Sequence, residues 1–426
     1  MLSITFFYSL LISSFIGSLL IVLDIDGNYM LGRISNENYR VIGFFWICYI
    51  MIMMPLTMLF ISQLLGFNAK KEYNEFLRKP IVLFRNTDDF FFVFSVLTVI
   101  SILSVIYTVM SVDKIPLIEM FKGSNNLGEL RIQASHAFSG NVYIKNIFAI
   151  GLTPILSLVA YIFASFSSKR RWRFLFVLLF PCAIFINIYD LQKSPIFFYF
   201  LMFILINVYI GKLRLNYKYL VLFGFSGVFL IILLYAFVQK VTSLDQFLSY
   251  NSGPIGRLIL SQIAPFYLHL DLFGNQMDFL AGKSLPGMLL GLYDLEQIRS
   301  AKIVMEHYFP ERVDQGIAGV LNTLYAGEAY ANFGNYGILF GTIYIALVIQ
   351  LIYIAFIRMP KHPVVVTVFV YFTVNIPRTL VGGFADFLFN PFWILVSVIF
   401  LGSLILIKIK YDFVADFKNY IKRLGN

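Results

Sequence analysis

The sequence predicts an all-helical membrane protein, a polytopic bundle of about ten transmembrane helices with a long membrane-associated external loop. Of its 426 residues, 59% are hydrophobic, 18% are aromatic and only 13% are charged, whereas about a quarter of the residues in a soluble domain are charged. Apolar runs of about 20 residues, the length of a membrane-crossing helix, recur between short basic segments. Lys and Arg are also distributed unevenly between alternate connections. A water-soluble globule is excluded, and residues 1–426 are expected to form a single integral membrane domain.

The expected spans follow the apolar runs in order. They cover about residues 4–23, 41–66, 90–110, 147–166, 174–190, 196–211, 218–239, 335–357, 363–382 and 387–407. The first run has neither a basic leader nor a small-residue cleavage pattern, so we expect it to be retained as a span.

Two connections are long, residues 111–146 and residues 240–334. Within the second connection, 254–274 is apolar enough to dip into the membrane. The segment 278–297 has the leucines and the Gly-Pro punctuation of an interfacial helix-turn-helix. Because irregular backbone at membrane depth needs protein or water around it, we expect this loop to fold back and line a cavity.

Charge counting orients these spans. With the amino terminus inside, the inside segments hold 19 of the 33 Lys and Arg in about 61 residues, and the outside segments hold 13 in about 161 residues. This is the asymmetry of the positive-inside rule. Both termini are therefore predicted to be cytoplasmic and both long loops external. The net charge of +10 is explained by this bias, so no nucleic-acid partner is predicted.

Several common catalytic signatures are missing from the sequence. There is no Walker A loop, HExxH, CxxC or GxSxG pattern, and the four histidines lack metal-ligand spacing. Cys48 and Cys182 both lie in apolar runs, so no disulfide framework is predicted. The sequence therefore predicts no metal site and no cofactor.

The most polar approach to a span is the segment 319–341, GVLNTLYAGEAYANFGNYGILFG. If residues 320–333 are helical, Tyr325, Glu328 and Asn332 share one face. A carboxylate beside hydroxyl and amide groups suits a ligand rich in hydroxyls, such as a sugar, and could act as a general base. The alternative is an interfacial glutamate paired with a loop arginine. Tyr325, Tyr330 and Tyr336 also fit the aromatic belt of a membrane interface.

Arg378 lies one turn below the outer end of the ninth expected span, with Asn375 three residues earlier on the same face. An arginine in hydrocarbon costs several kcal/mol on insertion scales unless it is paired or snorkels. It therefore either snorkels to the headgroups or binds a phosphate or diphosphate there, a role that suits the planar guanidinium fork.

Other charged residues lie in the two external loops. Arg131 lies near His136, Arg257 opens the membrane-dipping segment, and the further cations are Lys283, Arg299, Lys302 and Arg312. Arg131 and Arg257 are loop salt-bridge partners or cations recruited to one diphosphate. Asp271, with His269, lies in an apolar stretch and is a weaker functional candidate. Arg312, Glu306 and Glu311 are typical of a solvated face.

Together these features resemble the bacterial O-antigen polymerases, the oligosaccharide repeat-unit polymerases of the inner membrane. The resemblance rests on GEAYANFGNYG at 327–337, on ELR at 129–131, and on about ten spans with a long external loop before the last three. It implies a metal-independent glycosyltransferase that joins undecaprenyl-diphosphate-linked oligosaccharide units at the periplasmic face. It also implies the lipid bilayer, a chain-length regulator and a flippase as partners.

The resemblance assigns roles to the residues named above. Arg131 and Arg257 match the family's loop arginines and Glu328 its late-loop carboxylate, although neither arginine has the arginine-x10-glycine spacing of some members. The catalytic candidates are Glu328, Arg257 and Arg378, and the substrate-binding candidates are Arg131, His136, Tyr325, Tyr330 and Asn332. A glycan ligase with the same lipid-linked donor is the first alternative. A flippase or transporter is the second, but it would place polar residues at mid-membrane, where only Arg378 is clearly within a span.

Overall fold

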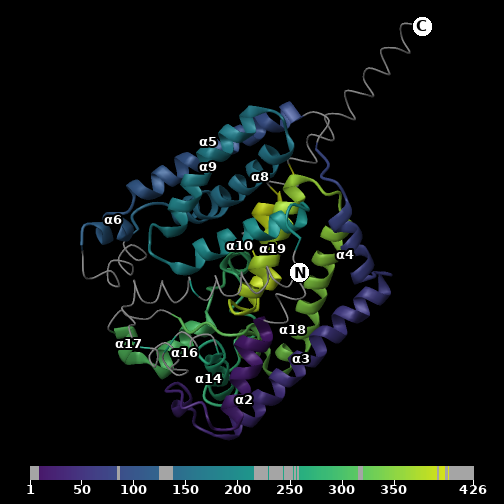
Figure 1. The fold of residues 1–426 in the computed structure, drawn as a ribbon. Coiled ribbons are helices and arrows are strands. Elements are labelled where there is room, and N and C mark those ends of the chain that lie inside the picture. Colours follow the sequence, from purple (N-terminus) through teal and green to yellow (C-terminus); the bar gives the residue numbers. More distant parts are fainter. Residues whose placement is uncertain are drawn as a thin grey trace. The chain divides into compact units, whose positions relative to one another are not determined.

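The structure is a computed structural model that describes residues 9–83, 87–123, 138–214, 259–314, 320–390 and 393–398, with the single residues 229, 243, 253, 256 and 402. All regular elements within these residues are helices, as Figure 1 shows. The all-helical class predicted from the sequence is thereby confirmed for the described part of the chain.

The chain divides into two compact units. Unit 1 comprises Met1–Glu72, Leu215–Ile357 and Phe372–Asn390, and unit 2 comprises Tyr73–Arg214, Arg358–Tyr371 and Pro391–Asn426. Two of the boundaries fall at long helices: one follows Ile357, near the end of α18 (Tyr325–Arg358), and one follows Tyr371, inside α19 (Pro363–Leu380).

Unit 2 is built on long apolar helices. Its elements are the end of α4 (Ala69–Arg78), α5 (Thr87–Met110), α6 (Pro116–Phe121), the π-helical η3 (Ile144–Leu152), α8 (Thr153–Phe166), α9 (Arg170–Ile188), α10 (Lys193–Tyr209) and the first half of α19 (Pro363–Leu380). The segment η3 runs directly into α8, and α8 packs along α9.

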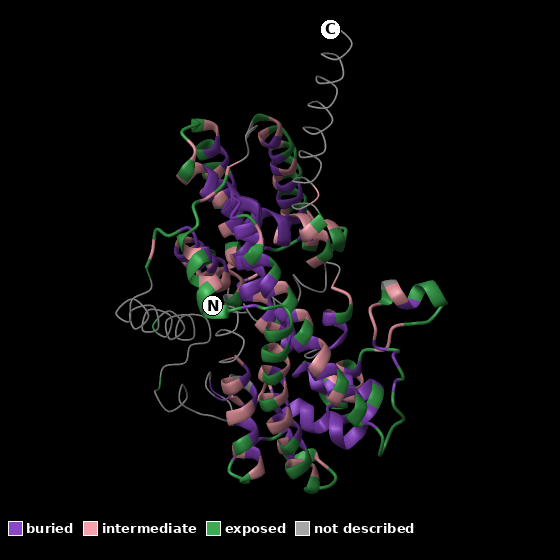
Figure 2. Ribbon diagram, turned by 90° about the vertical axis from the view of Figure 1, so that its right-hand side faces the viewer, coloured by how far each residue is buried: buried purple, intermediate pink, exposed green. Residues whose placement is uncertain are grey.

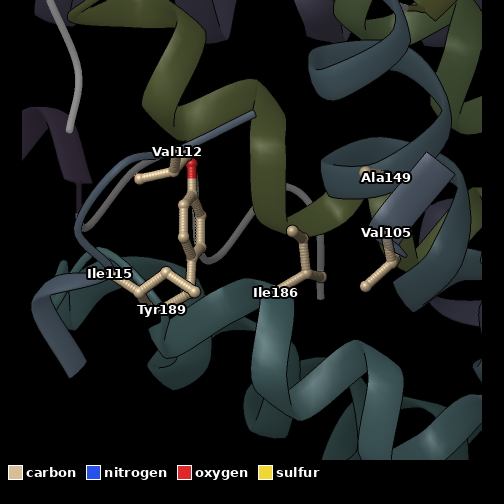
Figure 3. Packing of buried hydrophobic residues seen from close by; sticks show 6 residues of the cluster. All are labelled: Val105, Val112, Ile115, Ala149, Ile186 and Tyr189. Carbon is tan, nitrogen blue, oxygen red and sulfur yellow. The ribbon is translucent and has the colours of Figure 1, made fainter. Parts of the chain in front are cut away.

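Two side-chain clusters hold unit 2 together. Near the start of α5, the indole of Trp172 stacks on Phe163 with ring centroids 4.1 Å apart. Around the opposite end of α5, Figure 3 shows an aliphatic cluster with one tyrosine: Val105, Val112, Ile115, Ala149, Ile186 and Tyr189. Because the two clusters lie at opposite ends of α5, they fix the alignment of α5, η3–α8 and α9.

Unit 1 contains the segment that the sequence analysis singled out. Its elements are η1 (Leu11–Ile16), α2 (Gly17–Val22), η2 (Leu31–Arg33), α3 (Asn38–Leu64), the start of α4, α14 (Ala264–Leu272), α15 (Gly287–Leu290), η4 (Gly291–Tyr293), α16 (Ser300–Tyr308), α17 (Pro310–Asp314), α18 (Tyr325–Arg358), the second half of α19 and α20 (Ala385–Leu388). All nine residues of α14 are buried. Of the helix-turn-helix expected over 278–297, the structure contains α15 and η4 only.

The first connecting loop of unit 1 is pinned by ionic contacts. Arg40, in the first turn of α3, donates to the carboxylate of the buried Asp26 at 2.6 Å, and it also pairs with Asp24 and Glu37. Since Asp26 is 1% exposed, this pair is shielded from solvent screening, unlike an ordinary surface salt bridge.

Six helices are long and apolar enough to cross a membrane by length and composition: Asn38–Leu64, Asp88–Met110, Ile144–Phe166, Arg170–Ile188, Tyr325–Arg358 and Pro363–Leu380. Each of them matches an expected span to within a few residues, apart from the earlier start of Tyr325–Arg358. The expected span over 218–239 lies outside the described residues except for residue 229, and a total of ten spans stays a prediction.

The surfaces of the long helices are apolar too. Exposed positions on α3 include Val41, Phe45, Leu56, Leu59, Phe60 and Leu64, and those on α5 include Phe92, Val96, Val99, Leu103 and Met110. Figure 2 shows exposed and buried positions together along such helices. In water, contiguous apolar surface of this kind marks an interaction site, and on helices of membrane-crossing length it indicates contact with lipid.

Candidate functional site

The site begins at a break in α18. Gly334 has φ 59° and ψ −144°, so α18 is two helices joined by a kink. A break of this kind frees carbonyl groups that an unbroken helix would bond. The backbone N–H of Leu280 donates to Ala331 O at 2.8 Å, and that of Ala281 donates to Asn332 O at 3.1 Å. The segment 279–284 therefore docks on the end of the first half-helix.

Asn332 secures the same segment through its side chain. Its Oδ1 accepts a hydrogen bond from Gly282 N at 3.0 Å. Its Nδ2 donates to Ser284 Oγ at 2.6 Å and to Glu328 O at 2.8 Å. Ala281 has a left-handed φ of 49°, which costs a non-glycine residue about 1–2 kcal/mol. The docking contacts hold this strained turn in place.

Glu328 is the end point of this network. Ser284 Oγ donates to Glu328 Oε1 at 2.6 Å, and the backbone N–H of Ala385 donates to Oε2 at 3.0 Å. Gly383 lies so close that a Cβ there would overlap Glu328 Oε2. The carboxylate thus joins three segments of unit 1: the start of α18, the 279–284 turn, and the connection between α19 and α20.

A second carboxylate lies beside the first. Asp386 is half-buried and follows Ala385 directly, and its negative charge acts on Glu328. Burial raises the pKa of Asp386, and the nearby positive charge of Arg299 opposes that rise. Arg299 itself is exposed, immediately before α16. The site therefore holds two carboxylates of unequal environment and one cation.

Arg378 lies in the last turn of α19 and is exposed, with Nη1 donating to Asn375 Oδ1 at 3.1 Å. The two expected partners on this helical face therefore do interact. The chain turns after Arg378, since Val381 N donates to Arg378 O at 3.1 Å, and it reaches the Glu328 contact at Ala385. The structure places Arg378 and Glu328 in one compact unit.

The other candidate residues have different surroundings. Tyr325 is fully buried, and its hydroxyl lies 2.8 Å from Thr342 Oγ1, so in this arrangement it has no surface for a sugar. Tyr330 is half-buried, with its ring edge-on to Phe279 at 5.6 Å. Arg131, His136 and Arg257 lie outside the described residues.

Asp271 and His269 occupy the buried helix α14. Asp271 accepts hydrogen bonds from Ser35 N at 3.0 Å, from Ser35 Oγ, from Tyr308 Oη at 2.6 Å and from Gln276 Nε2 at 3.2 Å. His269 Nδ1 lies 2.7 Å from Pro265 O, and burial lowers its pKa to about 4. This carboxylate links the first loop of unit 1 to α14 and α16, which is a structural role.

The charged residues expected on a solvated face form surface contacts. Arg33 pairs with Glu311 at 2.8 Å, and Lys302 lies 3.5 Å from Glu306. The guanidinium of Arg312 lies over the ring of Tyr29 at 5.0 Å.

Ser284 and Asp386 were not predicted as site residues from the sequence, and Arg299 was predicted only as one of several loop cations. Ser284 and Asp386 are 44 and 58 positions from Glu328 along the chain, so no local periodicity connects them. Asp386 could have been found from the sequence, because it is a carboxylate in the short external connection between the ninth and tenth expected spans.

Two further observations complete the description of the site. In the described parts of the chain, no three residues among His, Cys, Asp and Glu gather as a metal-binding group, and the expected lack of a cofactor stays a prediction. No protein-family model, curated protein or solved structure matches the chain.

Proposed function

We propose that this protein is a membrane glycosyltransferase that polymerises undecaprenyl-diphosphate-linked oligosaccharide repeat units at the periplasmic face of a bacterial inner membrane. The observation that carries the proposal is the Glu328 carboxylate. It is held by Ser284 and Ala385 at the start of a long apolar helix, with Asp386 near it and Arg299 near Asp386. Apolar helices of membrane-crossing length and a fixed polar site at a helix entrance suit a substrate that is half lipid and half sugar.

In the proposed reaction, the growing glycan on its lipid diphosphate is the donor and one repeat unit on its own carrier is the acceptor. An acceptor hydroxyl attacks the anomeric carbon of the donor, the bond from that carbon to the diphosphate oxygen breaks, and the lipid diphosphate leaves with the electron pair. Glu328 orients or deprotonates the acceptor hydroxyl.

The arginines have the electrostatic role. Arg378, Arg257 and Arg131 bind the diphosphate and stabilise its charge as it leaves, which contributes a few kcal/mol for each well-placed donor. His136 and Tyr330 are the further proposed substrate contacts. Asn332 has a supporting role, because its side chain donates a hydrogen bond to Ser284. Tyr325 supports the site through its buried contact with Thr342.

The test is extension of purified lipid-linked repeat units by the purified protein without added metal. Wild-type protein should produce a ladder of longer glycans. Glu328→Gln or Arg378→Ala should strongly slow formation of the ladder while the protein still accumulates in the membrane, and Glu306→Gln, at an exposed pair on α16, should form it at the wild-type rate.

The outcomes separate the proposal from its alternatives. A protein that transfers finished polymer to another acceptor but makes none itself would be a ligase. A normal ladder from the Glu328 and Arg378 variants would remove both residues from the site.

A further inference from the structure

The two carboxylates of the site differ in how firmly they are held. Glu328 has both carboxylate oxygens engaged, one by the Ser284 hydroxyl and one by the Ala385 amide. It also lies against Gly383, where a side chain would collide with it. A carboxylate fixed on both oxygens is well placed to hold segments together and poorly placed to move toward a substrate.

Asp386 has the complementary properties. It is only half-buried, and among the described residues no side-chain or backbone donor is hydrogen-bonded to its carboxylate. Its Oδ2 lies beside Gly382, 3.0 Å from where a Cβ would stand at that residue. Gly382 is exposed and has no side chain that could cover this oxygen.

The surrounding charges suit a carboxylate that takes up a proton. In the described part of the chain, Arg299 from the segment before α16 acts on Asp386, and the charge of Asp386 acts in turn on Glu328 from α18. Burial favours the protonated form of Asp386, and Arg299 favours its ionised form. Burial therefore makes Asp386 a stronger base than an ordinary aspartate, and Arg299 limits that effect.

Resting on the proposed function, we infer that Asp386 is the catalytic residue that deprotonates the acceptor hydroxyl and that Glu328 is a positioning residue. The hydroxyl proton passes to the Asp386 carboxylate as the hydroxyl oxygen bonds to the anomeric carbon. The carbon–oxygen bond to the diphosphate breaks at the same time, so atoms and charge balance without a further reactant. Arg299 favours the ionised form of Asp386 before the reaction.

The test measures the rate of glycan extension from pH 5 to pH 9 for wild type and five variants, at matched protein levels and matched unfolding temperatures in detergent. Asp386→Asn should lower kcat by about 10²–10⁴-fold, the usual contribution of a general base, and should remove the acidic limb of the pH profile. Asp386→Glu should restore part of the rate and the limb. Asp294→Asn, at an exposed residue of the same unit, is the matched control and should resemble wild type.

The other two variants separate positioning from catalysis. Glu328→Gln should lower kcat and yet retain the acidic limb, displaced to lower pH because a neighbouring negative charge is gone. Arg299→Gln should displace the limb to higher pH, so that its rate deficit shrinks as the pH rises. If Glu328 and Arg299 had structural roles alone, their substitutions would not shift the acidic limb of the pH profile in opposite directions.

Three results would overturn the inference. Wild-type kcat in Asp386→Asn, with loss of the limb in Glu328→Gln, would make Glu328 the base and leave the proposed function intact. An Arg299→Gln variant with a higher KM for the donor at every pH and an unmoved limb would make Arg299 a phosphate ligand. Failure of wild-type protein to extend glycans would instead reject the proposed function, and this assignment of Asp386 with it.

Discussion

At the scale of single residues, unit 1 depends on buried polar groups whose partners come from distant segments. Asp271 is 0% exposed and accepts bonds from Ser35, Gln276 and Tyr308. A buried carboxylate is tolerated only when donors replace its hydration. Its four bonds supply that replacement and attach the first loop to the buried helix α14.

The first prediction concerns this carboxylate. Asp271→Asn replaces a charged acceptor of four hydrogen bonds with a neutral amide that has one accepting oxygen, so the bonds weaken and the free energy of unfolding should fall by about 2–3 kcal/mol. Tyr308→Phe, which removes a single bond, should cost about 1–2 kcal/mol. Denaturant unfolding of the detergent-solubilised protein would measure both. An Asp271→Asn variant as stable as wild type would show that the network does not hold the loop.

A second residue-scale prediction concerns pH. Burial lowers the pKa of His269 to about 4, whereas an unfolded histidine has a pKa of about 6.5. Between these values the unfolded state binds more protons, so stability must decrease as the pH falls through this window, by at most about 1.4 kcal/mol per pH unit. Above pH 7 the histidine should contribute no pH dependence.

His269→Gln removes this titration, so its unfolding temperature should fall less between pH 7 and pH 5 than that of wild type. The comparison uses the slope with pH, because the substitution also changes the absolute stability. Equal slopes in the two proteins would mean that His269 becomes protonated without unfolding.

At the scale of elements, the boundaries of the long helices could be predicted because hydrophobic runs record them. The prediction over 41–66 corresponds to α3 at Asn38–Leu64, and that over 147–166 to η3 and α8. Within 319–341, the sequence predicts a polar helix over 320–333 and a span that starts at 335, and the structure has a kink at Gly334 between the two. These features are local, and periodicity along the chain is enough to find them.

The partners of these elements could not be predicted in the same way. Charge counting assigns Lys361 to the basic excess of the inside segments. In the structure its ammonium is buried and donates to the carbonyls of Phe76, Leu77 and Lys79 at 3.0, 3.1 and 2.9 Å, where it caps the end of α4. A cation at a helix carboxyl terminus is favourable, but the pairing spans nearly 300 residues of sequence. The contact of Ser284 with Glu328 escaped prediction for the same reason.

The third prediction tests the kink itself. Gly334→Ala would place a Cβ in a backbone region that L-residues rarely adopt, 3.0 Å from the Phe279 ring. The variant should lose about 1–3 kcal/mol of stability, and it should also lose extension activity because the 279–284 turn that carries Ser284 is displaced. Gly291→Ala is the matched control, since nothing lies within 4 Å of its Cβ position. Equal effects of the two substitutions would exclude a special role for the kink.

At the scale of the whole molecule, the apolar helices indicate that the chain can cross a membrane, whereas the charge distribution predicts its orientation. Six helices can cross a membrane by length and composition, and their exposed faces carry large apolar side chains. Neither observation orients the protein. Orientation comes from the uneven distribution of Lys and Arg, which predicts that the connection containing α4 is cytoplasmic and the loop containing α15 and η4 is periplasmic.

The fourth prediction tests this orientation with single cysteines in a protein whose Cys48 and Cys182 are replaced by Ala. Leu292, 76% exposed in η4, and Lys70, exposed in α4, are the two positions to compare. In intact spheroplasts a membrane-impermeant maleimide should label Leu292→Cys at once and Lys70→Cys only after the membrane is permeabilised. The reverse pattern would place the loop, and with it Ser284 and Glu328, at the cytoplasmic face. A reaction with periplasmic lipid-linked glycans would then be impossible at this site, whatever the chemistry of its carboxylates.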